Sequence, residues 1–520
     1  MTAQVVAAPV LVALVTAVCS LAVRSRPRLR TAVSVGGALA FAGAAVAVAA
    51  RVYPDGVLVY HLGGWDAPFG IVLVADALSA FMLLLAALVA VPSAAFAARF
   101  VGEQGQRVSF HALFHFMLVG VAGAFLTGDV FNLFVWFEVM LMASYVLVVF
   151  YGGPSHTAAG MRYVVLNLVG SAVMLVAIGG LYATLGTLNM ADMARRLADP
   201  GAYGVDPAPV LGIAALLFSV FALKAGLVPF HFWVPGAYRA APAPVTAMLA
   251  GVVKKVGVYA VIRLYFTVFA AGEFDLALPG VDEGSALAYV GPVLLLLGAA
   301  SIVLGGVAAV GRDDLDGVLA FSSVSQVGFI VLPLAVGAAV PSLRAFGVAA
   351  ALVYSLHHAL GKSLLFLVVG VVSDATGTDS LGDLGGLAAR TPVVAGAFFV
   401  GSLSMVGIPP LAGFFGKLLV FDAAARAGDA AVLALALLGA LLTVAYLSRA
   451  WNRAFWGSPT PLADAAAPDR ALVAVVVVLA LAVVAVGVGF DPVFRFATAA
   501  GDAALARDAY VGAVFGGGGA

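Results

Sequence analysis

Charged side chains are scarce in this chain. Aspartate, glutamate, lysine and arginine make up 10% of its 520 residues, 63% are hydrophobic, and the formal net charge is zero. The mean hydropathy of +1.12 lies far above that of soluble domains. A balanced charge without a basic segment gives a nucleic acid nothing to bind. The composition therefore predicts an integral membrane protein with no nucleic-acid partner.

Cysteine is almost absent, since Cys19 stands alone. A single thiol excludes an internal disulfide, an iron–sulfur cluster and a cysteine zinc site. Residues 1–22 lack the basic start of a cleavable signal and are predicted to form a permanent first helix. His111 and His115 share a helix face, but no carboxylate or cysteine accompanies them. Phosphate-binding loops, dinucleotide fingerprints and serine nucleophile elbows are missing too, so we expect no metal, no cofactor and no enzymatic chemistry.

Long apolar runs fill the chain. A helix needs about 20 apolar residues to cross a bilayer, and fourteen windows meet this requirement, which predicts an all-α membrane protein of about 14 transmembrane helices. The windows are 4–23, 31–50, 70–92, 109–127, 129–151, 162–186, 208–228, 243–271, 287–309, 317–340, 343–372, 392–424, 430–448 and 469–490. The positive-inside rule places the arginines at 24–30 in the cytoplasm. Both termini then lie on the outside of the membrane.

All five lysines lie inside apolar windows, whereas the loops carry arginine. A charge in the hydrocarbon region costs about 2.5–3.5 kcal/mol on insertion scales, so such residues are rare and functional. Lysine, unlike arginine, can release its proton when desolvated. The lysines are therefore predicted to form a proton relay. They are Lys224, Lys254, Lys255, Lys362 and Lys417.

Two windows are interrupted by proline and glycine next to a lysine. One reads Lys224-Ala-Gly-Leu-Val-Pro229, and the other runs from Gly407 through Pro409-Pro410 to Lys417. Broken helices in the two halves of a membrane protein are typical of inverted repeats with ion sites near the midplane. An ordinary proline kink is the alternative. The lysine beside each break favours the functional interpretation.

Glu138 is the only acidic residue between Asp129 and Gly152. We expect it to hold Lys224 in its charged form until the two move apart, and the proton then leaves the lysine. A carboxylate that is paired for structure alone is the other interpretation.

The remaining candidates lie on two later windows. Lys254 and Lys255 point about 100° apart on a helix, so we expect Lys255 to face the relay and Lys254 to snorkel or to bind a partner subunit. His358 and Lys362 share a face at a spacing of four and could pass a proton along a water chain. His231 and His357 could extend the path.

The residues also resemble a known family. The run Phe125-Leu-Thr-Gly-Asp-Val-Phe-Asn-Leu-Phe-Val-Trp-Phe-Glu138 and the segment Pro229-Phe-His-Phe-Trp-Val-Pro-Gly-Ala-Tyr238 resemble the D subunit of Mrp-type cation/proton antiporters. The resemblance extends from about Asp76 to Trp456. The wider family includes proton-pumping subunits of respiratory complex I and of membrane-bound hydrogenases.

The resemblance implies two inverted five-helix repeats with a broken helix in each. The implied division is helices 1–3 in about 1–105, the first repeat in about 106–271, the second in about 285–456, and the last helix and tail in about 465–520. It also implies relay roles at matching positions. These positions are Glu138, Lys224, Lys255, His358, Lys362 and Lys417.

Together these observations predict a proton-translocating subunit of a multi-subunit Na⁺ or K⁺/proton antiporter that works with other membrane subunits. One alternative is the same relay in a redox-driven complex, either a complex I-like oxidoreductase or a hydrogenase. A second is a stand-alone transporter of an organic solute, although the sequence offers little for a solute to bind. A scaffold with an inactive relay is the third.

Overall fold

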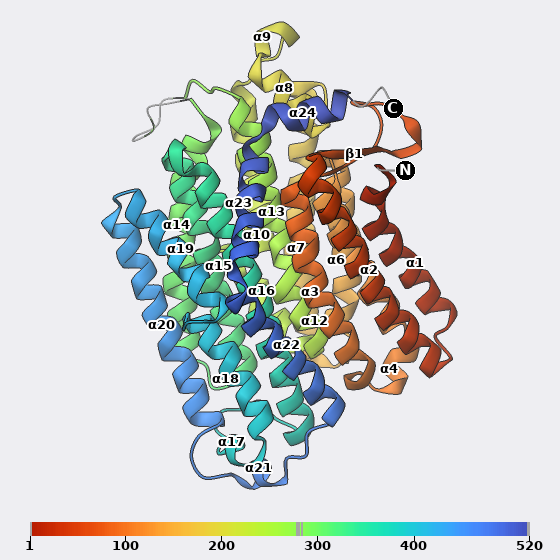
Figure 1. Cartoon of the computed structure of the whole chain (residues 1–520), viewed down its shortest axis with the longest axis vertical. Helices are drawn as coiled ribbons and strands as arrows, with labels where there is room; N and C mark the ends of the chain where they lie inside the picture. The colour runs from red at the N-terminus through yellow and green to blue at the C-terminus, as the bar shows by residue number, and fades with distance from the viewer. Residues whose placement is uncertain (1–2, 277–280, 282–283, 517–520) are drawn as a thin grey trace.

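The computed structural model describes residues 3–276, 281 and 284–516 as a bundle of long helices that lie side by side (Figure 1). Within these residues, twelve helices are long and apolar enough to cross a membrane. Two shorter apolar helices, α5 (Phe110–Leu126) and α18 (Pro392–Val406), lie among them. The predicted multi-pass helical fold is confirmed.

The first half of the chain includes one long helix with local changes of pitch. The long helix, from Ala243 to Ala271, includes two stretches of π-helix. The elements are η1 (Ala3–Ala7), α1 (Ala8–Ala22), α2 (Pro27–Asp55), α3 (Ala77–Phe100), α4 (Glu103–Arg107), α6 (Val130–Val148), α7 (Pro154–Leu185), α8 (Met190–Ala198), α9 (Pro200–Tyr203), α10 (Ala208–Ala225), η3 (Phe230–Phe232), α11 (Trp233–Ala240), α12 (Ala243–Met248), η4 (Leu249–Val253), α13 (Lys254–Val261), η5 (Ile262–Val268) and η6 (Phe269–Ala271).

The second half ends in helices that return across the whole bundle. In Figure 1, α22 and α23 follow one another from its lower to its upper end, so the predicted tail contains further ordered helix. The elements are α14 (Ala286–Val310), α15 (Leu315–Ala339), η7 (Pro341–Leu343), α16 (Arg344–Thr376), α17 (Leu387–Arg390), α19 (Ala412–Arg426), α20 (Ala430–Ala454), α21 (Pro461–Ala465), α22 (Arg470–Val488), α23 (Phe490–Leu505) and α24 (Arg507–Gly516).

One predicted window begins too early. Residues 70–92 were expected to form a single span, but Val72–Ala75 is strand β2, which pairs antiparallel with β1 (Leu58–His61). Helix α3 starts only at Ala77, because the Asp76 carboxylate accepts a hydrogen bond from the Ser79 amide and caps it. The loop between β1 and β2 holds η2 (Leu62–Gly64). This hairpin lies near η1 and α24 at one end of the bundle (Figure 1).

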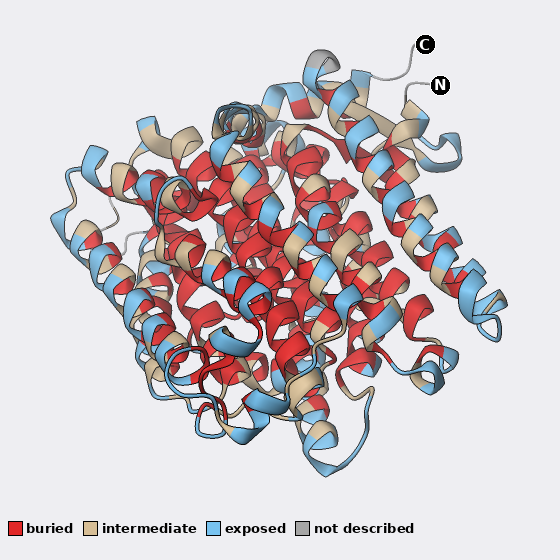
Figure 2. Cartoon of the chain, turned by 60° about the horizontal axis from the view of Figure 1, so that its bottom comes forward, coloured by how far each residue is buried: buried red, intermediate tan, exposed pale blue. Residues whose placement is uncertain are grey.

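Burial is arranged as expected for a membrane protein. Figure 2 shows buried residues through the centre of the bundle and exposed ones along the outer helices. The exposed side chains on these helices are largely apolar, such as Val176, Leu441 and Val478. An apolar surface of this extent fits a lipid environment rather than water. The polar residues of interest are therefore those inside.

A buried ion pair ties the start of α3 to the long helix. Arg263 of η5 lies 2.7 Å from the Asp76 carboxylate, and both side chains are at most 2% exposed. The guanidinium also contacts the Tyr259 hydroxyl and faces the ring of Tyr510. Arg263 lies within an apolar window, as the lysines do, but it was not among the predicted site residues.

We predict that Arg263→Leu destabilises the protein by about 3–5 kcal/mol, because it leaves the Asp76 carboxylate buried without a counter-ion. The control is Arg495→Leu, which removes an exposed pair with Asp491 and should cost less than about 1 kcal/mol. Thermal unfolding in detergent measures both. Equal shifts for the two variants would contradict the assignment.

Candidate functional site

The first predicted helix break is present and has Lys224 at its edge. Helix α10 ends at Ala225, and Gly226 adopts a left-handed conformation with φ of 73°, which glycine reaches without strain. The chain resumes as helix at η3 and α11. The indole of Trp233 donates a 2.8 Å hydrogen bond back to the Leu223 carbonyl in the last turn of α10, which ties the two sides of the break together.

Lys224 is held by aromatic rings rather than by a carboxylate. Its side chain is 2% exposed, and its amine has no hydrogen-bond partner among the described residues. The amine lies 5.8 Å from the ring centre of Trp233 and 5.9 Å from that of Tyr163. Desolvated cation–π contacts of this kind are worth about 2 kcal/mol, which is less than burial of a full charge costs.

Glu138 does not form a direct ion pair with Lys224 in this structure. The glutamate is half-buried on α6, and its carboxylate accepts a hydrogen bond from the hydroxyl of Ser171 on α7. No carboxylate of the described residues lies within 4.0 Å of the Lys224 amine. Any influence of Glu138 on the lysine therefore acts across a longer distance.

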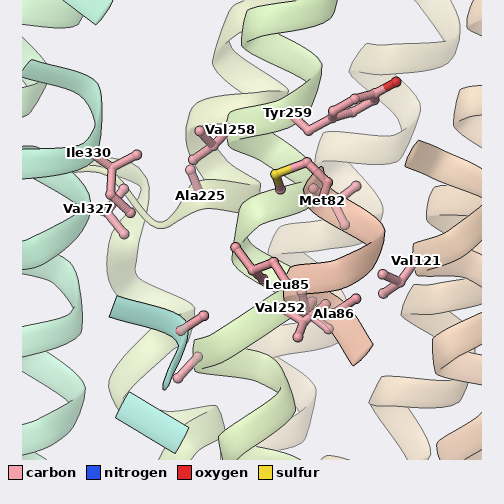
Figure 3. Close-up of a cluster of buried hydrophobic side chains, with 14 of the residues drawn as sticks. Met82, Leu85, Ala86, Val121, Ala225, Val252, Val258, Tyr259, Val327 and Ile330 are labelled. Atoms are coloured by element: carbon pink, nitrogen blue, oxygen red, sulfur yellow. The ribbon is translucent and has the colours of Figure 1, made fainter. Parts of the chain in front are cut away.

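The long helix approaches α10 closely at Gly257. A Cβ at this position would lie 2.6 Å from the Phe221 carbonyl oxygen and 2.8 Å from the Ala225 amide nitrogen. Figure 3 shows the neighbouring Val258 beside Ala225. This close contact brings the backbone that carries Lys254 and Lys255 against the break.

Lys255 reaches toward the second half of the chain. Its amine lies 2.6 Å from the Nδ1 atom of His358 on α16 and donates a 2.6 Å hydrogen bond to the Ala250 carbonyl. Both side chains are fully buried. This carbonyl belongs to η4, a π-helical stretch of the type that recurs at functional sites. The structure therefore brings these two predicted relay residues together.

Lys254 does not snorkel, and that prediction is wrong. Its side chain is 0% exposed, and its amine donates a 3.0 Å hydrogen bond to the Ser323 carbonyl on α15. A Cβ at Gly226 would lie 3.3 Å from this amine, so Lys254 fills the space at the first break. The 100° angle between adjacent residues directs the two lysines to different neighbouring helices, and both neighbours lie inside the protein.

Lys362 lies on the same face of α16 as His358, as predicted. Its amine donates hydrogen bonds to the Ser322 hydroxyl and, at 3.1 Å, to the Leu319 carbonyl of α15. Ser322 and Ser323 are adjacent, so α15 offers neighbouring acceptors to Lys362 and to Lys254. Helix α15 therefore links Lys254 of the long helix to Lys362 of α16.

The second predicted break is also present and resembles the first. Helix α18 ends at Val406, Gly407 has a φ of 95°, and α19 begins at Ala412. A Cβ at Gly407 would lie 3.0 Å from Cδ of Lys417, so the lysine side chain folds over the carbonyl end of α18. Lys224 and Lys254 lie at the carbonyl end of α10 in the same way. This end of a helix is where its dipole favours a cation.

Lys417 and His357 both lie near the second break. The Lys417 amine lies 5.4 Å from the ring centre of Phe329 and, among the described residues, has no hydrogen-bond partner. The His357 ring packs against Gly416, where a Cβ would come within 2.5 Å of it. Neither ring nitrogen of His357 has a partner within the part of the chain that the structure describes. A buried imidazole with both nitrogens free is suited to exchange a proton.

A neutral polar network next to His357 was not predicted from the sequence. The Tyr354 hydroxyl donates a 2.5 Å hydrogen bond to the Gln326 side chain, whose amide contacts Thr443 at 3.1 Å and Tyr446 at 3.0 Å. Tyr354 also packs edge-on against His357. The only sequence signal was Gln326 within an apolar window, because hydroxyl side chains are common in such helices.

Within the described residues, His231 forms no hydrogen bond with the other candidates. Its ring is half-buried and stacks on Phe232, with 4.6 Å between the ring centres. Its Nδ1 atom has no hydrogen-bond partner among the residues described. No hydrogen bond thus joins it to the lysines.

A cavity of about 530 Å³ opens where α16 ends. His156, Arg239, Asp316 and Asp379 contribute polar groups to its lining, and Thr246 of α12 lies on its wall. Burial raises the pKa of the Asp379 carboxyl. Thr246 precedes Lys254 by eight residues, about 12 Å along a helix, so the cavity approaches the buried lysines from one side.

Comparison with known proteins agrees with this architecture. Residues 127–443 match the model of the transmembrane family NADH:quinone oxidoreductase/Mrp antiporter. The chain is 35% identical over 470 residues to the Na⁺/H⁺ antiporter D subunit of Alkalihalophilus pseudofirmus, a match that covers 90% of each protein. It is 37% identical over 477 residues to the NADH-quinone oxidoreductase N subunit of Desulforudis audaxviator, a match that covers 88% of this chain and 89% of that one.

A solved structure gives the same result. A chain in the Mrp complex from Dietzia sp. superimposes with a TM-score of 0.87 at 31% identity, over 98% of this chain and 99% of that one. The chain thus belongs to the NADH:quinone oxidoreductase/Mrp antiporter family. The predicted resemblance to the D subunit of Mrp-type antiporters is confirmed.

We predict that Gly257→Ala slows ion transport and destabilises the protein by about 1–3 kcal/mol, since the added methyl group forces the long helix away from α10. Gly212→Ala is the matched control on α10, because a Cβ at Gly212 meets nothing within 4 Å. Transport assays and thermal unfolding measure the two effects. If Gly257→Ala behaved like Gly212→Ala, the close approach would not be needed to position the lysines.

Proposed function

We propose that this chain is the proton-translocating subunit of a multi-subunit monovalent cation/proton antiporter. The observation that supports the proposal best is a line of five buried lysines that runs from the first helix break to the second. No lysine amine lies within 4.0 Å of a carboxylate in the described residues. Family membership indicates which kind of ion transport the chain takes part in, and the buried lysines indicate the route of the protons.

Protons would pass along the line because neighbouring amines oppose each other's charge. A positive charge on Lys254 disfavours one on the adjacent Lys255, and the same holds between Lys255 and His358. A proton that enters at Lys224 therefore displaces a charge further along the line. The proposed order is Lys224, Lys254 and Lys255, His358 and Lys362, His357, and Lys417. Glu138 modulates Lys224 from a distance.

The polar cavity beside Asp379 and Thr246 is the proposed opening on the cytoplasmic side. Its position near arginine-bearing loops agrees with the positive-inside rule. The elements η1 and α24 lie at the opposite end of the bundle (Figure 1), which supports an even number of crossings and termini outside a bacterial plasma membrane. We propose fourteen crossings, with two inverted repeats at about 106–271 and 285–456 that each contain one break.

The partners would be other membrane subunits of the complex, as the multi-subunit assembly of the Dietzia Mrp relative suggests. The transported cation would be Na⁺ or K⁺. The alternative is the same relay in a redox-driven complex, and the 37% identity to an NADH-quinone oxidoreductase subunit supports it. In that case electron transfer in partner subunits would drive the protons.

Everted membrane vesicles that carry the complete native gene cluster distinguish the two functions. An ATP-driven proton gradient should collapse when Na⁺ or K⁺ is added, and the gradient should persist with Lys224→Ala. Immunoblots of both samples control for the amount of protein. A gradient that persists with well-expressed wild-type protein would reject the antiporter and favour the redox-driven complex.

Lys254 gives a separate test of the route. Lys254→Met should reduce the antiport rate about a hundredfold, the lower end of what one proton-transferring side chain contributes, and Lys255→Met should do the same. Arg162→Met is the control, because Arg162 is exposed on α7. A rate near that of the wild type for Lys254→Met would place Lys254 outside the route. Its hydrogen bond to Ser323 would then have a structural role only.

A further inference from the structure

Two hollows lie away from the lysines, along α2, α3 and α22. One is an apolar groove of about 570 Å³, and all of its lining residues are apolar. Leu39 and Val46 of α2, Leu88 of α3 and Val478 of α22 contribute exposed side chains to it. The groove therefore opens on the outer surface of the bundle, where lipid lies.

The other hollow is a basic pocket of about 510 Å³ at the arginine-rich end of α2 and α3. Arg28, Arg30 and Arg99 line it. Its acidic member, Glu103, is already paired with Arg107 at 2.6 Å, and Arg99 is paired with Asp469 at 2.7 Å. Within the described residues, no carboxylate lies within 4.0 Å of Arg28 or Arg30.

Arg30 gives this pocket a fixed positive charge. It is 2% exposed, and it donates hydrogen bonds to the Arg24 carbonyl at 2.6 Å and to the Gln106 side chain at 2.9 Å. Its buried Nε has no partner among the residues described. Glu103 lines the same pocket but makes no ion pair with Arg30. A buried guanidinium whose direct acceptors are neutral and which keeps a free donor favours an anionic partner.

The two hollows are neighbours along α3. Ala95 lines the groove, whereas Ala98 and Arg99 line the basic pocket. Three residues correspond to about 4.5 Å along a helix. A molecule with an anionic head and an apolar tail could therefore occupy both at once, with its head at the membrane surface and its tail along the groove.

We propose that α2, α3 and α22 form a binding site for one anionic phospholipid. Its phosphate would lie against Arg28 and Arg30, and one acyl chain would fill the groove between Leu39 and Val478. Basic pockets between helices on the cytoplasmic side are suited to anionic headgroups, which that leaflet supplies. The exposed apolar wall of the groove would bury the acyl chain of the lipid along its length. This site is separate from the lysine line and holds whether or not antiport is the function.

Native mass spectrometry of the purified complete complex tests the site. The complex is titrated with phosphatidylglycerol and, separately, with phosphatidylcholine, and lipid-bound fractions are compared. Phosphatidylglycerol should bind at least about fivefold more tightly, because each nearby arginine contributes about that factor toward an anionic lipid. Arg28→Gln should reduce this preference about fivefold, and Ala42→Phe, which narrows the groove, should weaken binding of the same lipid.

Two controls keep the result specific. Arg162→Gln removes an exposed arginine on α7, and Ala434→Phe adds a ring to an exposed position on α20. Both variants should bind phosphatidylglycerol like the wild type. Equal binding of the two lipids, or no effect of Arg28→Gln, would overturn the proposal.

Two further results would show that the site is occupied by something other than a lipid. Inorganic phosphate that displaces phosphatidylglycerol, together with no effect of Ala42→Phe, would show a site for a free anion. A photo-reactive amino acid at Val46 that crosslinks to another protein of the complex rather than to lipid would show that a protein helix covers the groove. Either result would overturn the proposal.

Discussion

The structure depends on amines that are buried without a counter-ion. A charge in a low-dielectric interior is costly unless it is paired and hydrogen-bonded. None of the five lysines has a carboxylate within 4.0 Å in the described part of the chain, whereas the buried Arg263 has Asp76. The lysines instead contact carbonyls, a serine hydroxyl, an imidazole and aromatic rings. Such contacts tolerate both the charged and the neutral amine, as a relay requires, while a permanent ion pair would fix one form.

The helix breaks and the close-packing glycines follow from this constraint. Gly226 and Gly407 end their helices in left-handed conformations, and each lies against a lysine side chain. Gly257 lets the long helix approach α10, and Gly416 admits the ring of His357. Because every one of these positions is tightly packed, the amines keep their spacing without any carboxylate to anchor them. The apolar layer around Met82, Leu85 and Val252 (Figure 3) keeps the surrounding dielectric low.

Much of the fold could be predicted from the sequence, because membrane-spanning helices need long apolar runs and helix breaks need glycine and proline. The hairpin at Val72–Ala75 could not, since a short buried strand and a buried helix share one composition. Within the site, the spacing of His358 and Lys362 was informative. The position of Lys254 was misjudged because the residues that face it, Gly226 and Ser323, are distant in sequence. A direct contact between Glu138 and Lys224 was inferred from their opposite charges, but the structure does not contain it. Whether two such groups touch depends on the directions of their side chains, which the sequence does not give.

Replacement of lysine by arginine at the two breaks tests the central claim most directly. Arginine keeps the positive charge and most of the length of lysine but does not release its proton. Antiport in everted vesicles should therefore be lost in both Lys224→Arg and Lys417→Arg, with protein amounts and thermal stability close to those of the wild type. Antiport near the wild-type rate in either variant would show that a fixed positive charge is sufficient there, and would contradict a proton relay through the lysines.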